Sequence, residues 1–167
     1  LTGHIVLSTL HTNDAIGVIP RLIDLKVEPF LLPSSLNLML AQRLISRVCP
    51  DCKKAEKAPA DLQVLIKKEL ENLPEKVIKN LAEPYEIYHG QGCKTCQNKG
   101  IVGRVAMFEV FRMTPELAEI ISAGFTEKNL SEEARRQGMI TLRQDGILKA
   151  LQGLVTMEEV LRETMEV

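Results

Sequence analysis

The arrangement of its four cysteines is the feature of this sequence that most constrains its fold. They stand in two C-x-x-C pairs, Cys49 with Cys52 and Cys93 with Cys96, and 40 residues separate the pairs. A two-residue spacer lets both sulfurs of a pair face one ion, and two pairs complete a tetrahedral four-sulfur shell, a preferred structural site of zinc. Such pairs usually lie about 15–20 residues apart. The pattern therefore predicts a zinc site at the base of an inserted arm that leaves after Cys52 and returns before Cys93.

Other uses of the cysteines compete with structural zinc. Two disulfides would require an oxidising compartment, and nothing in the sequence indicates secretion. A redox motif needs only one pair, and free or unrelated thiols are the remaining alternative. We expect zinc, and because four thiolates leave no open coordination position, we expect it to be structural rather than catalytic. Residues 49–99 contain nine lysines, no arginine and eight acidic residues. This segment is nearly neutral, so we expect no nucleic acid as a partner.

The composition is that of an ordinary globular chain. Of the 167 residues, 45% are apolar and 26% charged, and the net charge is −1, which gives no basic field to attract nucleic acid or an anionic membrane. No apolar run is long enough to predict a transmembrane helix. The sequence begins at Leu1, directly in strand-like residues and without a basic or cleavage region. We therefore interpret it as a piece of a longer protein.

Apolar periodicity predicts one strand followed by two helices in residues 1–48. Residues 1–11 contain the run Ile5-Val6-Leu7, which is typical of a strand buried on both faces in a parallel sheet. Within residues 12–25, Thr12, Asn13 and Asp14 are suited to an N-cap, and a helix is predicted after them through Leu25. Apolar residues four positions apart predict another helix over 34–48; these are Leu36, Leu40, Leu44 and Val48.

The rest of the sequence predicts the arm and a helical end. Within segment 49–99, apolar residues at helical spacing predict a helical arm over 53–92, in which Pro74 begins a second, shorter helix. Segment 100–167 begins with a strand over 105–111. Four helices are predicted after it: one capped by Thr114 with Pro115 as its first residue, one over 127–137, one marked by Ile147 to Leu154, and one opened by a capping box at Thr156–Glu159.

Two histidines, His4 and His11, bracket the first predicted strand. In open α/β sheets ligands bind at the carboxyl ends of the strands, which is where His11 lies. The helix start that follows, from Thr12 to Ala15, offers free backbone N–H groups that suit an anion. His11 is therefore a candidate to hydrogen-bond a phosphate or to position a water. The alternative is a histidine whose contacts are purely structural.

Several motifs occur in the order found in one protein family. Residues 1–15, LTGHIVLSTLHTNDA, resemble the histidine box of the secretion ATPases that drive type II secretion and type IV pilus assembly. Further motifs of that family follow in order: Arg21–Asp24, Glu28–Phe30, Ala41–Leu44, both cysteine pairs, Gly100–Arg104 with Glu109, and Thr141–Gly146. The resemblance covers nearly the whole chain, except the arm at 53–92. The tetracysteine element counts against the pilus-retraction branch.

The resemblance implies the C-terminal part of a RecA-like P-loop ATPase core, with a tetracysteine zinc arm and a C-terminal helical bundle. The intact protein would be a cytoplasmic homohexamer, peripheral to the inner membrane, that couples ATP hydrolysis to secretion or pilus assembly through an inner-membrane platform protein. His11 matches the box histidine near the terminal phosphate, so it is the catalytic and nucleotide-binding candidate. His4 matches the earlier box histidine and is a second catalytic candidate. Arg21 and Arg43 match basic positions without an assigned contact.

The phosphate loop is missing from the sequence. It contains no G-x-x-x-x-G-K-[ST] motif, and the acidic segments that would hold magnesium are expected to precede Leu1. ATP and Mg²⁺ are therefore expected only in the intact protein, and the isolated chain is expected to hydrolyse ATP at the background rate. Two alternatives stay open: a free-standing zinc-stabilised interaction module, and a nucleic-acid-binding zinc ribbon. The motifs do not distinguish type II secretion from pilus extension.

Overall fold

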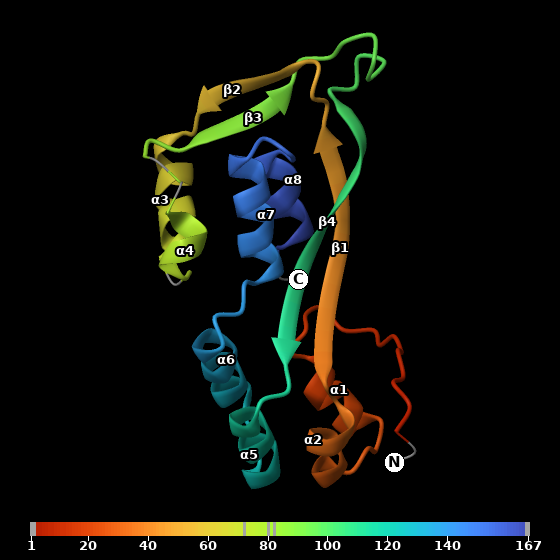
Figure 1. The fold of residues 1–167 in the computed structure, drawn as a ribbon. Helices are drawn as coiled ribbons and strands as arrows, with labels where there is room; N and C mark the ends of the chain where they lie inside the picture. The colour runs from red at the N-terminus through yellow and green to blue at the C-terminus, as the bar shows by residue number, and fades with distance from the viewer. Residues whose placement is uncertain (1–2, 72, 80, 82, 166–167) are drawn as a thin grey trace. The chain divides into compact units, whose positions relative to one another are not determined.

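The structure is a computed structural model that describes residues 3–71, 73–79, 81 and 83–165. It is a mixed α/β chain, as predicted (Figure 1). The described residues group into two compact units. Unit 1 contains the residues up to Ala41 together with Glu109–Met139, and unit 2 contains Gln42–Phe108 together with the residues from Ile140 onward. The sequence predicted a division by role into segments 1–48, 49–99 and 100–167. The two compact units do not test that division, so it stays a prediction.

Unit 1 consists of short helices around one apolar core. Its helical elements are α1 (Val18–Asp24), the 3-10 turn η1 (Pro29–Leu31), α2 (Leu32–Ser35), α5 (Pro115–Ala123) and α6 (Glu127–Arg136). Thr114 caps α5 by accepting a hydrogen bond from the Leu117 N–H at 3.2 Å, and Pro115 is its first residue, as predicted. The core draws on separate parts of the chain: Ala15, Ile19, Leu32, Met39, Phe111, Leu117, Ile121, Leu130 and Ala134.

The strand predicted over 1–11 is absent from the part of that range that the structure describes, so the prediction was wrong there. Ile5, Val6 and Leu7 have exposed fractions of 88%, 79% and 96%. A strand buried on both faces needs a neighbour on each side to satisfy its backbone groups. Among the described strands, none pairs with this range. The apolar run is therefore exposed and irregular here.

Two long strands, β1 (Leu38–Val48) and β4 (Ile101–Arg112), pair with each other in a two-stranded sheet. β4 confirms the strand predicted over 105–111 and extends it in both directions. β1 replaces the helix predicted over 34–48, and that prediction was wrong.

The four-residue spacing explains the error in β1. Residues four apart share one face of a helix, but four is an even number, so they also share one face of a strand. Up to Ile45, burial follows the strand period: Met39 and Ile45, six positions apart, are buried, whereas Leu40 and Leu44 on the other face have exposed fractions of 50% and 55%. At the end of the strand the alternation stops, because Val48 is buried as well.

The arm belongs to unit 2 and is a strand pair that carries two helices. Its elements are β2 (Lys53–Lys57), α3 (Ala60–Leu70), α4 (Glu75–Ile78) and β3 (Glu86–Gly90). β2 pairs antiparallel with β3, with Lys53 opposite Gly90, and this pairing returns the chain to its starting point. The two helices confirm the prediction, including the start of α4 after Pro74. The strands were not predicted, because β2 is the fully exposed sequence KKAEK without apolar alternation.

The last two helices, α7 (Leu142–Leu151) and α8 (Met157–Glu163), also belong to unit 2 and contact each other. Thr156 caps α8 by accepting a hydrogen bond from the Glu159 N–H at 3.2 Å. The Glu159 carboxylate accepts a hydrogen bond from the Ser46 N–H at 3.2 Å, so it ties α8 to β1 instead of completing the predicted capping box. In the described part of the chain, no helix has the length and apolarity needed to cross a lipid bilayer.

Candidate metal centre and histidine loop

The four cysteine sulfurs lie together, within 4.8 Å of one another. The Sγ–Sγ distance is 3.8 Å for Cys49–Cys93, 3.8 Å for Cys52–Cys96 and 3.7 Å for Cys93–Cys96. A zinc ion with Zn–S bonds of about 2.3 Å holds its sulfurs at tetrahedral edges of about 3.8 Å. A disulfide would need an S–S distance of about 2.05 Å, and all four residues are free cysteines. The spacing therefore fits one four-sulfur zinc site.

Close contact between two backbones brings the cysteine pairs together. Cys49 follows directly after β1, and its N–H donates to the Gly100 carbonyl at 2.9 Å. Gly90, at the end of β3, lies against Gly100 so closely that a Cβ at position 90 would be 2.0 Å from the Gly100 carbonyl oxygen. Only glycine fits at this contact. The glycines on either side of the second pair thus allow the arm to close on its base.

The pKa values of three of the thiols are shifted in different directions by their surroundings. Burial raises the pKa of the Cys52 thiol to about 12 and also raises the pKa of Cys49. Burial is the largest single influence on Cys96 as well, but backbone N–H groups of Cys93 and Gly100 donate to its sulfur at 3.1 and 3.2 Å and, with neighbouring thiols, lower its pKa to about 6. A bound cation would favour the thiolate at all four positions, because its charge offsets the cost of burial.

His11 lies in a shallow hollow of about 290 Å³ in unit 1. The lining consists of His11, Thr12, Asn13, Asp14, Gly17, Pro20, Arg21 and Asp24. The expected N-cap residues lie here, but α1 begins only at Val18; Asp14 Oδ1 accepts a hydrogen bond from the Gly17 N–H at 2.6 Å and holds the turn before it. The structure therefore places His11 and Arg21, both exposed, in one polar hollow whose lining also includes the carboxylates of Asp14 and Asp24.

The other candidate residues lie elsewhere. His4 is exposed and is not among the residues that line the hollow. Arg43 lies on β1 in unit 2, in the same unit as the four cysteines and apart from the unit that contains Arg21. The structure thus brings together the four cysteines in one unit and His11 with Arg21 in the other.

Glu109 has a position that the sequence did not reveal. It lies on β4, has an exposed fraction of 4%, and its Oε1 accepts a hydrogen bond from the Ala15 N–H at 2.8 Å. Ala15 lies in the chain between Asp14 and Gly17, which both line the hollow. Glu109 stood out in the sequence only as part of a motif, and the 94 positions between the two residues explain why no local pattern indicated this contact.

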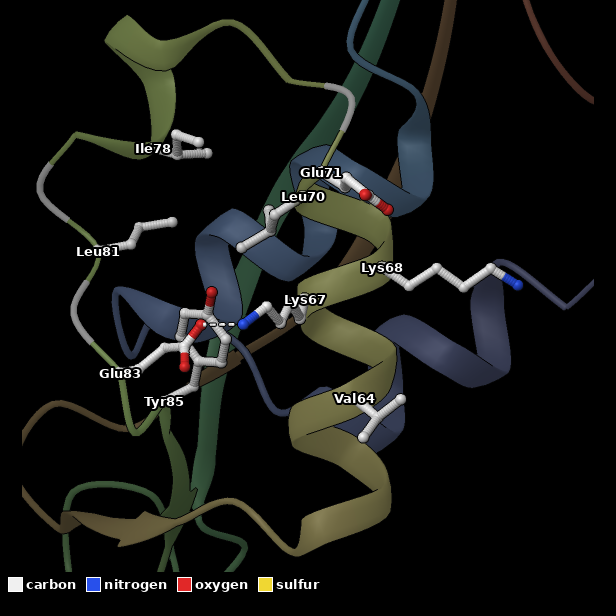
Figure 2. A pocket seen from close by; sticks show the side chains of 9 residues that line it. All are labelled: Val64, Lys67, Lys68, Leu70, Glu71, Ile78, Leu81, Glu83 and Tyr85. Carbon is white, nitrogen blue, oxygen red and sulfur yellow. Dashed lines mark ion pairs between the residues drawn. The ribbon is translucent and has the colours of Figure 1, made fainter.

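A separate groove of about 460 Å³ lies on the arm (Figure 2). It runs between α3 and the segment that leads from α4 to β3, and its apolar lining comes from Val64, Leu70, Ile78, Leu81 and the ring of Tyr85. Its charged lining residues are Lys67, Lys68, Glu71 and Glu83, and Lys67 and Glu83 form an ion pair at 3.1 Å. None of the residues predicted as site residues from the sequence lines this groove.

The sequence as a whole also matches known proteins. The family described as type II/IV secretion system protein matches residues 1–162. The chain belongs to this family. Among relatives of the type II/IV secretion family, the type IV pilus assembly ATPase PilB of Myxococcus xanthus is 44% identical over 170 residues, which cover 98% of this chain and 28% of the relative. The type II secretion system ATPase E of Vibrio cholerae is 38% identical over 166 residues, 99% of this chain and 31% of the relative.

A third member of the type II/IV secretion family, the PilB of Thermus thermophilus, is 44% identical over 167 residues, 99% of this chain and 18% of the relative. The chain thus spans less than a third of the length of these relatives. The family assignment drawn from the ordered motifs is confirmed.

Proposed function

We propose that this chain is the C-terminal part of a hexameric motor ATPase that couples ATP hydrolysis to type II protein secretion or type IV pilus assembly. The observation that carries this proposal is the match over residues 1–162 to a family whose relatives are named as ATPases of both machines. On this proposal, residues 1–48 and the strand that follows the arm belong to a RecA-like core, and the helices after that strand form a C-terminal bundle.

The hollow around His11 is the part of the nucleotide site that this chain contributes. His11 lies at the terminal phosphate of ATP, where it hydrogen-bonds the phosphate or positions a water, and His4 has a supporting catalytic role. The Arg21 guanidinium in the same lining supports this assignment, because a guanidinium binds phosphate well. The phosphate loop and the magnesium ligands are not in this sequence. ATP and Mg²⁺ therefore bind in the intact protein, and the isolated chain is inactive.

Cys49, Cys52, Cys93 and Cys96 hold one structural Zn²⁺. The sulfur spacing near 3.8 Å supports a tetrahedral zinc site. When bound, the metal cross-links the end of β1 to the turn after β3 and fixes the base of the arm. The shell is closed, so the chemistry that zinc supplies here is structural.

The intact protein works in the cytoplasm, at the periphery of the inner membrane, as a homohexamer bound to a platform protein of the secretion or pilus machine. The arm and the C-terminal helices convey the nucleotide state to that partner. Their attachment supports this role, since Gln144 at the start of α7 donates to the Glu69 carbonyl of α3 at 2.9 Å. Nucleic acid is not a partner, because residues 49–99 carry nine lysines against eight acidic residues.

The transport role is tested in the organism that carries the gene. Replacing the gene by a His11→Ala version is expected to abolish either surface pili or exoprotein secretion, and the process lost assigns the branch. His89→Ala is the control and is expected to leave both processes intact, since His89 lies on β3 of the arm, outside the hollow, with its Nδ1 3.7 Å from Glu56 Oε1. Normal pili and normal secretion in the His11→Ala strain would refute the role proposed for this hollow.

A further inference from the structure

A buried carboxylate on β4 holds the loop that carries His11. Glu109 is one of two charged residues buried among the described residues; the other is Glu133, and each has an exposed fraction of 4%. Burying a carboxylate is costly unless hydrogen bonds compensate it. The Ala15 N–H supplies one such bond, at 2.8 Å to Oε1.

The same bond satisfies a backbone group in the loop. Ala15 is fully buried and precedes α1, so its N–H has no acceptor within that helix. A buried N–H without an acceptor costs free energy comparable to a lost hydrogen bond. The loop from His11 to Gly17 is thus held at two points, by the Glu109 bond to Ala15 and by the Asp14 bond to Gly17.

Glu133 provides an internal comparison. Its carboxylate accepts hydrogen bonds from Arg136 and Gln137 on the same turn of the chain and from the Thr114 hydroxyl at 2.9 Å. These bonds join α5 to α6 and do not reach the loop. Both glutamates lie in unit 1 and are equally buried. Glu109 accepts a hydrogen bond from the backbone beside the hollow, whereas Glu133 joins two helices.

We propose that Glu109 is a positioning residue for the His11–Asp14 loop, and that it sets the place of His11 for ATP turnover. This inference rests on the proposed function of the hollow. Glu109 is not among the residues that line the hollow, so it acts through the Ala15 backbone rather than by touching the nucleotide.

Two conservative variants separate this role from a need for negative charge. Glu109→Gln keeps an oxygen acceptor at the same reach. Glu109→Asp keeps the charge but is one methylene shorter, which withdraws the acceptor by about 1.5 Å and out of hydrogen-bond range. Positioning through the Ala15 N–H predicts that the Gln variant resembles the wild type and that the Asp variant is impaired. A role of the charge itself predicts the reverse.

The test uses the intact protein that contains this chain, and two measurements. Hydrogen exchange of the peptide that contains the Ala15 amide is expected to accelerate about tenfold or more in Glu109→Asp and to stay unchanged in Glu109→Gln and in the control Glu133→Gln. In steady-state ATP hydrolysis, Glu109→Asp is expected to lower kcat about tenfold with little change in KM, whereas Glu109→Gln keeps kcat within about twofold.

The outcomes separate this inference from the proposed function. Unchanged exchange at Ala15 in Glu109→Asp overturns the positioning role, and so does accelerated exchange with an unchanged kcat. An equal loss of kcat in the Asp and Gln variants also overturns it. If the intact wild-type protein does not hydrolyse ATP, the proposed function fails, and the role of Glu109 in turnover fails with it, while the exchange data still decide whether Glu109 holds the loop.

Discussion

Single residues decide whether the metal site and the core of unit 1 can form. Gly90 and Gly100 allow two backbones to touch beneath the cysteines, and Glu133 joins α5 to α6 from a buried position. The sequence predicted the four cysteine ligands as a group because their spacing has a direct geometric meaning. It did not predict Glu109 or Glu133, since their partners depend on how distant segments pack, and no local pattern records that.

Gly90→Ala is expected to destabilise the arm and weaken zinc binding. Its Cβ would meet the Gly100 carbonyl oxygen at 2.0 Å, and a backbone atom in a pair of linked turns has little room to shift. The expected loss in the free energy of unfolding is about 2–3 kcal/mol or more. Urea unfolding and zinc retention on a desalting column measure the two effects.

Gly103→Ala is the control for this substitution. A Cβ at position 103 meets no atom within 4 Å, but Gly103 has a φ of 68°, so alanine there carries only the backbone cost of about 1 kcal/mol. If Gly90→Ala lowers stability no more than Gly103→Ala, the close approach of the two backbones is not a requirement of the fold.

The acid stability of unit 1 is expected to depend on Glu133. Hydrogen bonds from the Arg136 guanidinium, the main cause, hold the pKa of Glu133 at about 2, below its ordinary value of 4.5. A carboxyl whose pKa is lower in the folded state stabilises the fold above pH 4.5 and loses that contribution as the pH falls towards 2. Thermal unfolding between pH 5 and pH 2 should therefore show a smaller fall in Tm for Glu133→Gln than for the wild type. Parallel curves would contradict this assignment.

At the scale of elements, the sequence predicted the helices whose caps and apolar faces are marked by residues close together in the chain. The cap Thr114 and the apolar faces of α3 and α5 each carry such a signal, and these helices form where expected. α7 begins at Leu142, ahead of the range that Ile147 to Leu154 marked, and Thr141 was not predicted as its cap. β1 was misassigned because a spacing of four fits both helix and strand. β2 was missed because exposed strands without apolar alternation carry no pattern, and the run at residues 5–7 lacks the neighbouring strands that it needs.

The contact between α3 of the arm and the start of α7 forms a joint between these elements. It uses Arg143 and Gln144, two residues of the Thr141–Gly146 motif. Arg143 at the start of α7 pairs with Glu69 of α3 at 3.0 Å, with exposed fractions of 32% and 27%. A double-mutant cycle with Arg143→Ala and Glu69→Ala is expected to give a coupling of about 0.5–1 kcal/mol in the free energy of unfolding. The control pair Lys128–Glu132 is more exposed, at 85% and 59%, and should give less. Equal couplings would argue against a specific joint.

At the scale of the whole molecule, the two candidate sites lie in two different units. Unit 2 contains the cysteines and the arm, and unit 1 contains the histidine hollow. Composition and periodicity predicted a mixed α/β chain but could not predict this division, because each unit combines stretches that are far apart in the sequence. The family could be predicted from the sequence because its long motifs occur in the family's order along nearly the whole chain.

Removing zinc is expected to loosen unit 2 and leave unit 1 unchanged. The purified chain should contain one zinc under reducing conditions, and chelation should expose four thiols together. Hydrogen exchange should then accelerate in residues 49–57 and 86–100, which join at the metal site, but not in α5 and α6. A chain without metal whose thiols react freely, or chelation that changes both units equally, would contradict the structural zinc site.

The proposed function is tested most directly by ATP turnover of the intact protein, measured beside its His11→Ala variant and the isolated 167-residue chain. We expect ATP hydrolysis by the intact protein, a large loss in the variant, and only background hydrolysis by the isolated chain, whose sequence contains no phosphate loop. Turnover by the isolated chain, or an intact protein whose turnover does not depend on His11, would contradict it.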